Sequence, residues 1–404
     1  MTDVRTRTER SRVPLAGLIS ATALSYTGNQ IVAVVMPWLV LAKTGSASLA
    51  GLVGAAAVAP MVLSTLFGGA LVDRVGRRFA SICADLLSAA AVAALPLLDS
   101  TVGLGIALIL ILVALGAIFD GPGAAAREAM RPDVARRALM PLERVNAWGE
   151  AAENVGAILG PGLAGLLLAW IGGFGTLWAA VGLFVAAVVF TATTVPRGIS
   201  PEPHRGESFL RSIVVGLKFV WNDRAIRDVS IAAMIAMLFL TPLTLVLTAH
   251  LQDVGRATDL ALVLSSFAIG GLAGAIGYGV VGHRLPRRGT LAGAVALVGL
   301  GFFGLAFLPP VWGMAVIAGA IGIVAGPINP VAAVIMQERT PEHLRGRVIG
   351  TFASLAMAAG PLGMLVFGPV IEFGGAGIAF AAIGIGCLVS AIYAAASRGL
   401  REGV

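Results

Sequence analysis

The chain has 404 residues, of which 58% are hydrophobic and only 12% are charged, and its formal net charge is +7. A soluble domain carries about 25% charged residues, so this composition excludes a protein whose whole surface faces water. The positive charge lies between long apolar segments, which argues against nucleic acid as a partner and favours helices in a lipid bilayer.

We expect the charged segment from Met1 to Arg12 to be a short tail before the first span and not a cleavable signal sequence. Short hairpins at Gly172–Gly173 and Pro309–Pro310 require antiparallel neighbours. We predict an all-α membrane protein whose twelve transmembrane helices form two pseudo-symmetric six-helix bundles. The predicted spans are residues 15–40, 49–72, 79–98, 103–125, 147–170, 174–195, 229–251, 259–282, 289–308, 311–336, 348–370 and 374–396.

The basic residues predict the orientation of these spans. All of the 28 Lys and Arg residues except Lys43 and Arg256 fall on one side of the arrangement. The positive-inside rule makes that side cytoplasmic. We therefore expect a multi-pass protein of the cell (inner or plasma) membrane with both termini in the cytoplasm.

A polar segment, residues 196–208, precedes an amphipathic stretch, residues 208–222, that is typical of a helix lying in the membrane interface. These segments predict an N-terminal bundle over residues 1–195, a cytoplasmic linker over 196–228 and a C-terminal bundle over 229–404.

The two bundles carry a repeated pattern, G-x-x-x-[D/H]-R-x-[G/P]-R-R. Pro132-Asp133 is matched in the second half by Pro341-Glu342, and Gly160-Pro161 by Gly360-Pro361. Three matches in the same order indicate an internal duplication. The first copy of the pattern comprises Gly69, Asp73, Arg74, Gly76, Arg77 and Arg78, and the second comprises Gly279, His283, Arg284, Pro286, Arg287 and Arg288.

The stretch from Gly69 to Arg78 resembles the loop 2–3 signature of the major facilitator superfamily. Gly156, Gly160, Pro161 and Gly165 resemble the fifth-helix motif of its antiporters, with Ala164 in place of one glycine. Within that superfamily the chain is similar to Tap-type multidrug efflux pumps of the drug:proton antiporter branch. The stretches that carry this similarity are 119–122, 144–146 with Glu150 and Asn154, 344–348 and 357–363.

The resemblance covers essentially the whole chain, and it implies the major facilitator fold and proton-coupled export of amphipathic drugs by alternating access. Two departures stand against it. Residues 103–119 lack the fourth-helix arginine of other antiporters, and Asn29 replaces the acid that Tap-like pumps usually carry in the first span.

An ionisable residue inside a span costs about 2.5–3.5 kcal/mol on insertion scales and is a functional candidate by default. The buried acids are expected only in the first half. Asp120 is the predicted proton carrier, and Arg127, two helical turns further along the same face, is its predicted partner. The alternative is a static Asp120–Arg127 pair. Gly121-Pro122-Gly123 is predicted to break or kink the helix beside them.

Other acids are further candidates for proton coupling. Glu150 shares a helix face with Asn154 and could relay protons, bind substrate amines or pair with Arg127, while Glu153 lies on the neighbouring face. Asp85 is expected to make a structural pair with a basic loop residue.

By resemblance, spans 1, 4, 7 and 10 line a central cavity. Amide and hydroxyl side chains there could instead be hydrogen-bond contacts between helices. The candidate substrate-binding residues are Tyr26, Asn29, Gln30, Phe119, Asn154, Met237, Thr241, Thr244 and Asn329.

The first copy of the repeat, with Asp73 beside a helix N-terminus in the family arrangement, is expected to latch the two halves in the outward-facing state. The alternative is a basic anchor only, and His283 in the second copy predicts that this half has lost the latch. Gly156, Gly160, Pro161 and Gly165 predict a smooth helix face that packs closely and seals the non-cytoplasmic side.

No cofactor or metal is predicted, because His204, His250, His283 and His343 lie far apart, and no enzyme motif occurs in context. The expected partners are a small amphipathic substrate, protons and the lipid bilayer, with the chain a monomer. The alternatives are an exporter or flippase-like transporter of a physiological amphiphile (a siderophore or lysolipid), or an uncoupled uptake facilitator.

Overall fold

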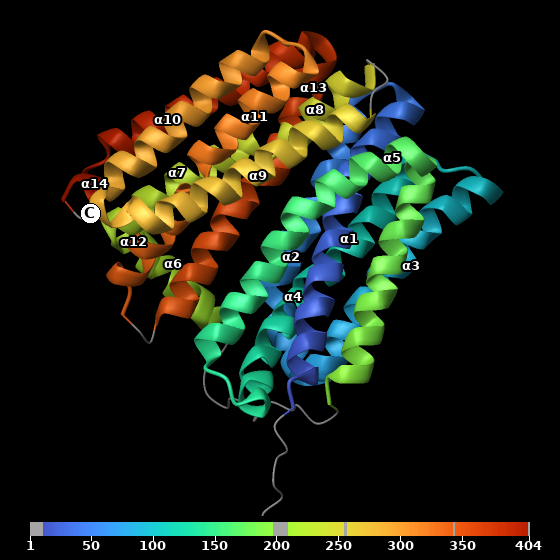
Figure 1. Cartoon of the computed structure of the whole chain (residues 1–404), viewed down its shortest axis with the longest axis horizontal. Coiled ribbons are helices and arrows are strands. Elements are labelled where there is room, and N and C mark those ends of the chain that lie inside the picture. The colour runs from blue at the N-terminus through green and yellow to red at the C-terminus, as the bar shows by residue number, and fades with distance from the viewer. Residues whose placement is uncertain (1–10, 197–208, 254–256, 342–343, 403–404) are drawn as a thin grey trace, which may run out of the picture.

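The computed structural model describes residues 11–196, 209–253, 257–341 and 344–402, and within these ranges every regular element is a helix (Figure 1). In chain order the elements are α1 (Val13–Thr44), α2 (Ala47–Val75), α3 (Arg77–Thr101), α4 (Ile106–Ala138), α5 (Leu142–Thr194), α6 (Phe209–Asn222), α7 (Arg224–Leu240), α8 (Leu243–Asp253), α9 (Ala257–Val281), the 3-10 helix η1 (Gly282–Arg284), α10 (Arg287–Ala306), α11 (Val311–Ala325), α12 (Ile328–Arg339), α13 (Arg345–Ala396) and α14 (Arg398–Glu402).

Ten helical segments within the described ranges are long and apolar enough to cross a membrane. Two of them, α5 and α13, contain a glycine with φ in the left-handed region, Gly172 at 70° and Gly375 at 77°. Glycine permits this conformation because it has no Cβ. At both positions the chain doubles back, so that α5 and α13 each supply two crossings and the twelve predicted spans are confirmed (Figure 1).

Helix α4 is longer than the sequence predicted. It continues through Pro122 and Pro132 to Ala138, so the helix does not break at residues 121–123, and the alternative of a kink there stays a prediction. The missing proline N–H removes one backbone hydrogen bond, and in a membrane neighbouring helices compensate for such a loss. The glycine serves packing instead, because a Cβ on Gly123 would lie 2.8 Å from the Cβ of Ala84 on α3.

Two spans of the second half are interrupted. Span 7 divides into α7 and α8 around Pro242, and span 10 divides into α11 and α12 around Pro327. The helix predicted for residues 208–222 is confirmed as α6, its position in the membrane interface stays a prediction, and residues 197–208 of the predicted linker lie outside the described residues. The start of α7 is set by Asp223, whose carboxylate accepts a hydrogen bond from the Ile226 backbone N–H at 2.9 Å.

The arginine hairpin of the first half joins three helices. The guanidinium of Arg77 lies 2.8 Å from the carboxylate of Asp133 on α4. The Arg78 guanidinium donates to the carbonyl oxygen of Ala192, near the end of α5, at 2.6 Å. Gly76, with φ of 91°, forms the turn between α2 and α3.

The second arginine hairpin repeats both contacts. Arg287 pairs with Glu338 on α12, and Arg288 donates to the carbonyl oxygen of Ala395 near the end of α13. This agreement supports the internal duplication. The arginine partner of the second hairpin is Glu338, whereas Glu342, the residue that the sequence repeat matches with Asp133, lies outside the described ranges.

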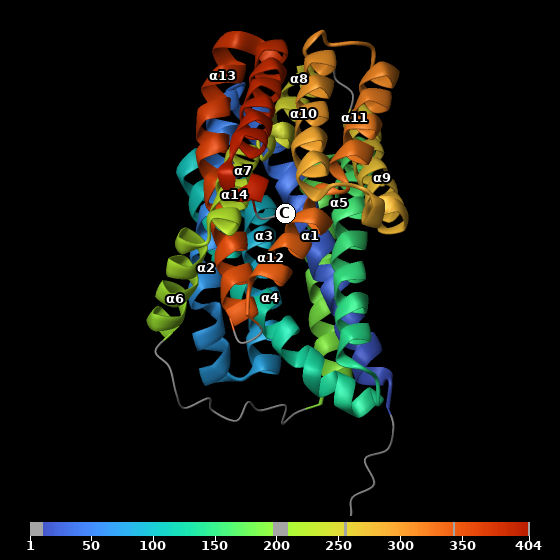
Figure 2. The same cartoon turned by 90° about the vertical axis from the view of Figure 1, so that its left-hand side faces the viewer.

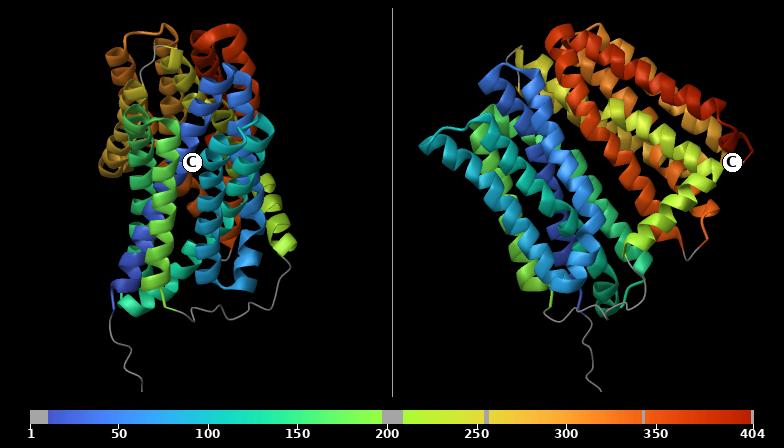
Figure 3. Two further views of the ribbon diagram at one scale, coloured as in Figure 1. Left: turned by 90° about the vertical axis from the view of Figure 1, so that its right-hand side faces the viewer. Right: turned by 180° about the vertical axis from the view of Figure 1, so that it is seen from behind.

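The two halves pack against each other at one end, which we call the closed end. A Cβ on Gly165 of α5 would lie 2.5 Å from the Cβ of Ala261 on α9. A Cβ on Gly51 of α2 would lie 2.5 Å from the carbonyl oxygen of Met364 on α13. Figures 1 and 3 show the halves converging here and diverging toward the other end.

We call the opposite end the hairpin end, because both arginine hairpins lie there. Helices α2 and α9 make the contacts just described close to their first turns, and the hairpins follow their last turns. The duplicated hairpins are therefore on the same side of the molecule, as the orientation of the spans predicted. The amphipathic α6 runs along the outside of the bundle toward this end (Figure 2).

Candidate functional site

A buried ion pair crosses the interior of the first half. Asp85 on α3 is 3% exposed and Arg127 on α4 is 6% exposed. The Arg127 Nη1 lies 3.1 Å and 3.3 Å from the two carboxylate oxygens of Asp85. The hydroxyl of Ser25 on α1 donates to the same carboxylate at 2.7 Å. Three helices are therefore joined by one neutral, hydrogen-bonded pair.

This pair corrects one prediction, because Arg127 forms its ion pair with Asp85 and not with Asp120. Asp85 does pair with a basic residue, as expected, but the residue that the predicted spans placed in the loop after residue 125 lies within the longer helix α4. Residues two turns apart on one helix are separated by roughly 10 Å along its axis. Asp85 instead approaches Arg127 from the side, on the neighbouring helix.

Asp120 has uncharged hydrogen-bonding partners, although the nearby Asp85–Arg127 pair also interacts with it electrostatically. It is partly buried, and one of its carboxylate oxygens lies 3.1 Å from the Ser88 hydroxyl, which donates to it. The side chain of Asn29 also faces it. Within the described ranges no basic residue pairs with Asp120. A carboxyl group among neutral hydrogen-bonding partners can keep its contacts whether or not it carries a proton.

A second ion pair lies nearer the hairpin end. The guanidinium of Arg131, a residue 9% exposed, lies 2.6 Å from the carboxylate of Glu153 on α5. Gly149 makes room for it, since a Cβ there would lie 2.6 Å from the Arg131 Cζ. Glu150, on the same helix, is exposed. The sequence reasoning missed Glu128, an exposed residue of α4 that interacts electrostatically with Arg131 and Glu153, because it ended span 4 too early.

The glycines of α5 bring this helix against α1. A Cβ on Gly156 would lie 3.1 Å from the Cβ of Tyr26, and one on Gly160 would lie 2.4 Å from the Cβ of Gln30. The close packing predicted for this stretch is thus confirmed, with Pro161 partly buried beside it and Gly165 against α9 of the other half. Its role as a seal stays a prediction.

The predicted substrate-binding residues lie on both halves. Tyr26 and Met237 are each 37% exposed. The Thr241 hydroxyl donates to the Met237 carbonyl oxygen at 2.7 Å, where α7 ends. The structure brings Asn29 to Asp120. The remaining residues are exposed (Asn154, Asn329) or partly buried (Asn29, Gln30, Phe119, Thr241, Thr244).

The residues of the predicted latch differ in the contacts that they make. Arg77 and Arg78 bond within the first half, as described above, and Arg74 is exposed. Gly69 and Asp73 belong to α2, but the Asp73 side chain lies outside what the structure describes. Because the halves diverge at this end, latching in the outward-facing state stays a prediction.

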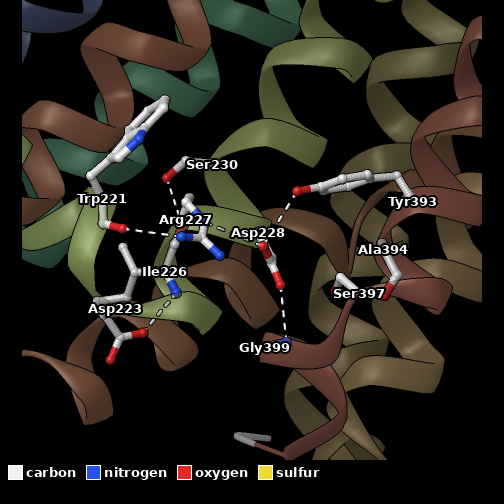
Figure 4. A network of polar contacts seen from close by, with 10 residues as sticks. All are labelled: Trp221, Asp223, Ile226, Arg227, Asp228, Ser230, Tyr393, Ala394, Ser397 and Gly399. Atoms are coloured by element: carbon white, nitrogen blue, oxygen red, sulfur yellow. Dashed lines mark hydrogen bonds and ion pairs between the residues drawn. The ribbon is translucent and has the colours of Figure 1, made fainter.

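A further buried acid lies in the second half, where none was expected. Asp228 on α7 is 6% exposed; the Tyr393 hydroxyl, 3.3 Å away, and the Gly399 backbone N–H, 3.0 Å away, donate to its carboxylate (Figure 4). The predicted span 7 began at residue 229, five residues after the first residue of α7, and so left Asp228 out. Asp223 is a typical N-cap residue, and recognising it would have started the helix at Arg224 and placed Asp228 within it. Asp228 joins the start of α7 to the end of α13 and to α14.

A cavity of about 280 Å³ opens at the closed end of the first half, lined mainly by apolar side chains and by the Lys43–Asp99 ion pair. It is separate from the acids described above. Within the described ranges no group of three or more His, Cys, Asp and Glu residues is arranged to hold a metal ion.

A family model described as the Major Facilitator Superfamily matches residues 18–256 and 229–403. The chain is 39% identical over 402 residues to the multidrug efflux pump Tap of Mycolicibacterium fortuitum, with 98% of each chain covered. It is 36% identical over 398 residues to the protein of that name from Mycobacterium tuberculosis, with 97% of this chain and 95% of that protein covered. A crystal structure of the nucleoside transporter NupG matches with a TM-score of 0.81 at 12% identity, covering 95% of this chain and 100% of that one, a likeness of fold.

Proposed function

Because this chain belongs to the major facilitator superfamily, we propose that it exports amphipathic drugs from the cytoplasm in exchange for protons. The observation that carries this proposal is the similarity, over 98% of both chains, to a multidrug efflux pump. The chain is a multi-pass membrane transporter of small substrates and not an enzyme. As alternatives, a pump for a physiological amphiphile and an uncoupled facilitator give different results in the experiment below.

Transport proceeds by alternating access. The two halves, which we place at residues 1–195 and 229–404, rock about a site between them. The positive-inside rule assigns the hairpin end to the cytoplasm, together with both termini. The structure is then closed toward the outside. In this scheme the glycine contacts at the closed end part when the pump opens outward, and the chain works as a monomer in the bilayer.

Asp120 carries the proton in this proposal. It has neutral partners in Ser88 and Asn29, whereas Asp85 and Arg127 neutralise each other. Glu150 and Glu153 form a path toward the cytoplasmic end, with Glu153 held by Arg131. A membrane potential of about 100 mV supplies about 2.3 kcal/mol for each charge moved, roughly a fiftyfold gradient per proton.

The substrate contacts come from both halves. Aromatic and polar side chains on a largely apolar wall suit ligands of varied shape. Exposed carboxylates of Glu128 and Glu150, on the cytoplasmic part of α4 and α5, favour drugs that carry a positive charge. The proposed binding residues are Tyr26, Asn29, Gln30, Phe119 and Asn154 in the first half and Met237, Thr241, Thr244 and Asn329 in the second.

The test uses purified protein in liposomes with an imposed pH gradient and a fluorescent tetracycline as probe. We expect gradient-dependent accumulation that Asp120→Asn abolishes. Glu143→Gln, which neutralises an exposed acid at the start of α5, is the matched control and should transport normally. Accumulation that survives collapse of the gradient would exclude proton coupling. Loss in Glu150→Gln but not in Asp120→Asn would move the proton site to α5, and movement of a lysolipid but not of the drug would favour a physiological amphiphile.

A further inference from the structure

One carboxylate crosses from the second half to the first at the closed end. Glu372 lies on α13, three residues before the reversal at Gly375, and its side chain is exposed. Its Oε2 accepts hydrogen bonds from the Ser46 hydroxyl at 2.8 Å and from the Ser48 backbone N–H at 2.8 Å. Ser46 is the N-cap residue of α2. The N-terminus of a helix in one half is therefore capped by a side chain of the other half.

The capping is shared between the two halves. The first backbone N–H groups of a helix have no partner within it. The Ser46 side chain accepts from the Leu49 N–H at 3.2 Å, whereas the N–H of Ser48 donates to Glu372. A negative charge at this position is also favoured by the helix dipole. If the halves separate here, the N–H of Ser48 and the carboxylate of Glu372 both lose these contacts.

The helix crossing next to Glu372 fixes its position. Met364, Gly368 and Glu372 are spaced four residues apart on α13 and share one face. A Cβ on Gly368 would lie 2.8 Å from the Ser48 Cα, and the Sδ of Met364 would lie 3.2 Å from a Cβ on Gly54. The close approach of these two backbones holds Glu372 beside its donors. Separation of the halves at the closed end would move the carboxylate away from them.

We infer that Glu372 is a positioning residue for transport, one that holds the pump closed to the outside by capping α2 across the interface. This rests on the alternating access of the proposed function. Glu372 shifts the equilibrium between the conformations open to the cytoplasm and open to the outside, and it does not bind substrate. A ligand or side chain that contacts only one of two states shifts their equilibrium by that difference.

The test measures the conformations without drug or gradient. Spin labels at Ser100→Cys and Trp312→Cys report on the closed end, and labels at Arg137→Cys and Gln337→Cys report on the hairpin end, in a protein whose Cys83 and Cys387 are replaced by Ala. Glu372→Gln keeps the shape of the side chain but removes its charge. We expect it to raise the population that is open at the closed end about two- to fivefold. Glu372→Ala should raise it further, since the acceptor is also lost.

The controls separate loss of the Glu372 contact from a general effect of removing a charge. Glu143→Gln neutralises an exposed acid far from the contact and should leave both distance distributions unchanged. Ser46→Ala removes one of the two donors, so it should act in the same direction as Glu372→Gln, and the two changes should not be additive. Unchanged closed-end distances in both Glu372 variants would overturn the inference, as would additivity with Ser46→Ala. Failure of drug export in liposomes would refute the proposed substrate and leave these distances unaffected.

Discussion

Replacement of Asp85 by Asn tests the buried pair that organises the first half. The change keeps the shape of the side chain and leaves Arg127 charged in the bundle interior without a counter-charge. Both residues are less than 10% exposed, and the guanidinium lies 3.1 Å from the carboxylate. The energy of this pair is therefore that of a buried ion pair and not that of an exposed one. Removing one partner of such a pair costs about 3–5 kcal/mol.

The double variant Asp85→Asn with Arg127→Met separates loss of the pair from loss of packing. Methionine fills much of the volume of the arginine stem without a charge. The double variant leaves no charge in the interior, and the amide oxygen introduced by Asp85→Asn can still accept the hydrogen bond from Ser25, so we expect it to recover to within about 1 kcal/mol of the original protein. Asp120→Asn provides the comparison, because Asp120 has no ion-pair partner within the described ranges and its replacement should cost much less stability.

The assay is reversible unfolding in detergent micelles, followed by tryptophan fluorescence, with the free energy of unfolding compared across the variants. Six tryptophans provide the signal. The reasoning fails if Asp85→Asn is no more destabilising than Asp120→Asn, or if the double variant is as unstable as the sum of its single changes. Either result would mean that Arg127 finds a partner elsewhere or that water reaches the pair.

Three other changes have expected outcomes. Gly165→Ala places a methyl group 2.5 Å from the facing side chain of α9, so it should destabilise the closed end by about 1–3 kcal/mol and lengthen closed-end label distances, whereas Gly182→Ala, which meets nothing within 4 Å, should not. Arg77→Ala should lower the midpoint of unfolding more than Arg287→Ala does, because the first ion pair is the less exposed of the two. Asp228→Asn should weaken the anchoring of α14 by about 1–3 kcal/mol, seen as faster hydrogen exchange at residues 397–402, and unchanged exchange would contradict the assigned contacts.

The sequence alone determined the membrane class, the twelve spans and the duplication. Apolar segments of this length have few stable arrangements, because lipid leaves the backbone no partner outside its own helix. The hairpin at Gly172–Gly173 was predictable for a local reason, since the turn needs residues without a Cβ clash. Helix α6 was predictable from the helical spacing of apolar and polar residues along one short stretch.

Only the tertiary structure decided which charges meet. Asp120 and Arg127 share a helix face in the sequence, yet the guanidinium bonds to Asp85 on another helix, because contacts between helices depend on their rotation and separation. The same reason hid Glu372, whose donors are more than 300 positions away along the chain. Asp228 and Glu128 were missed because helix ends depend on capping and neighbouring contacts, which apolar periodicity does not record. Local periodicity thus fixed the elements, and the packing of distant elements fixed the polar contacts from which we propose function.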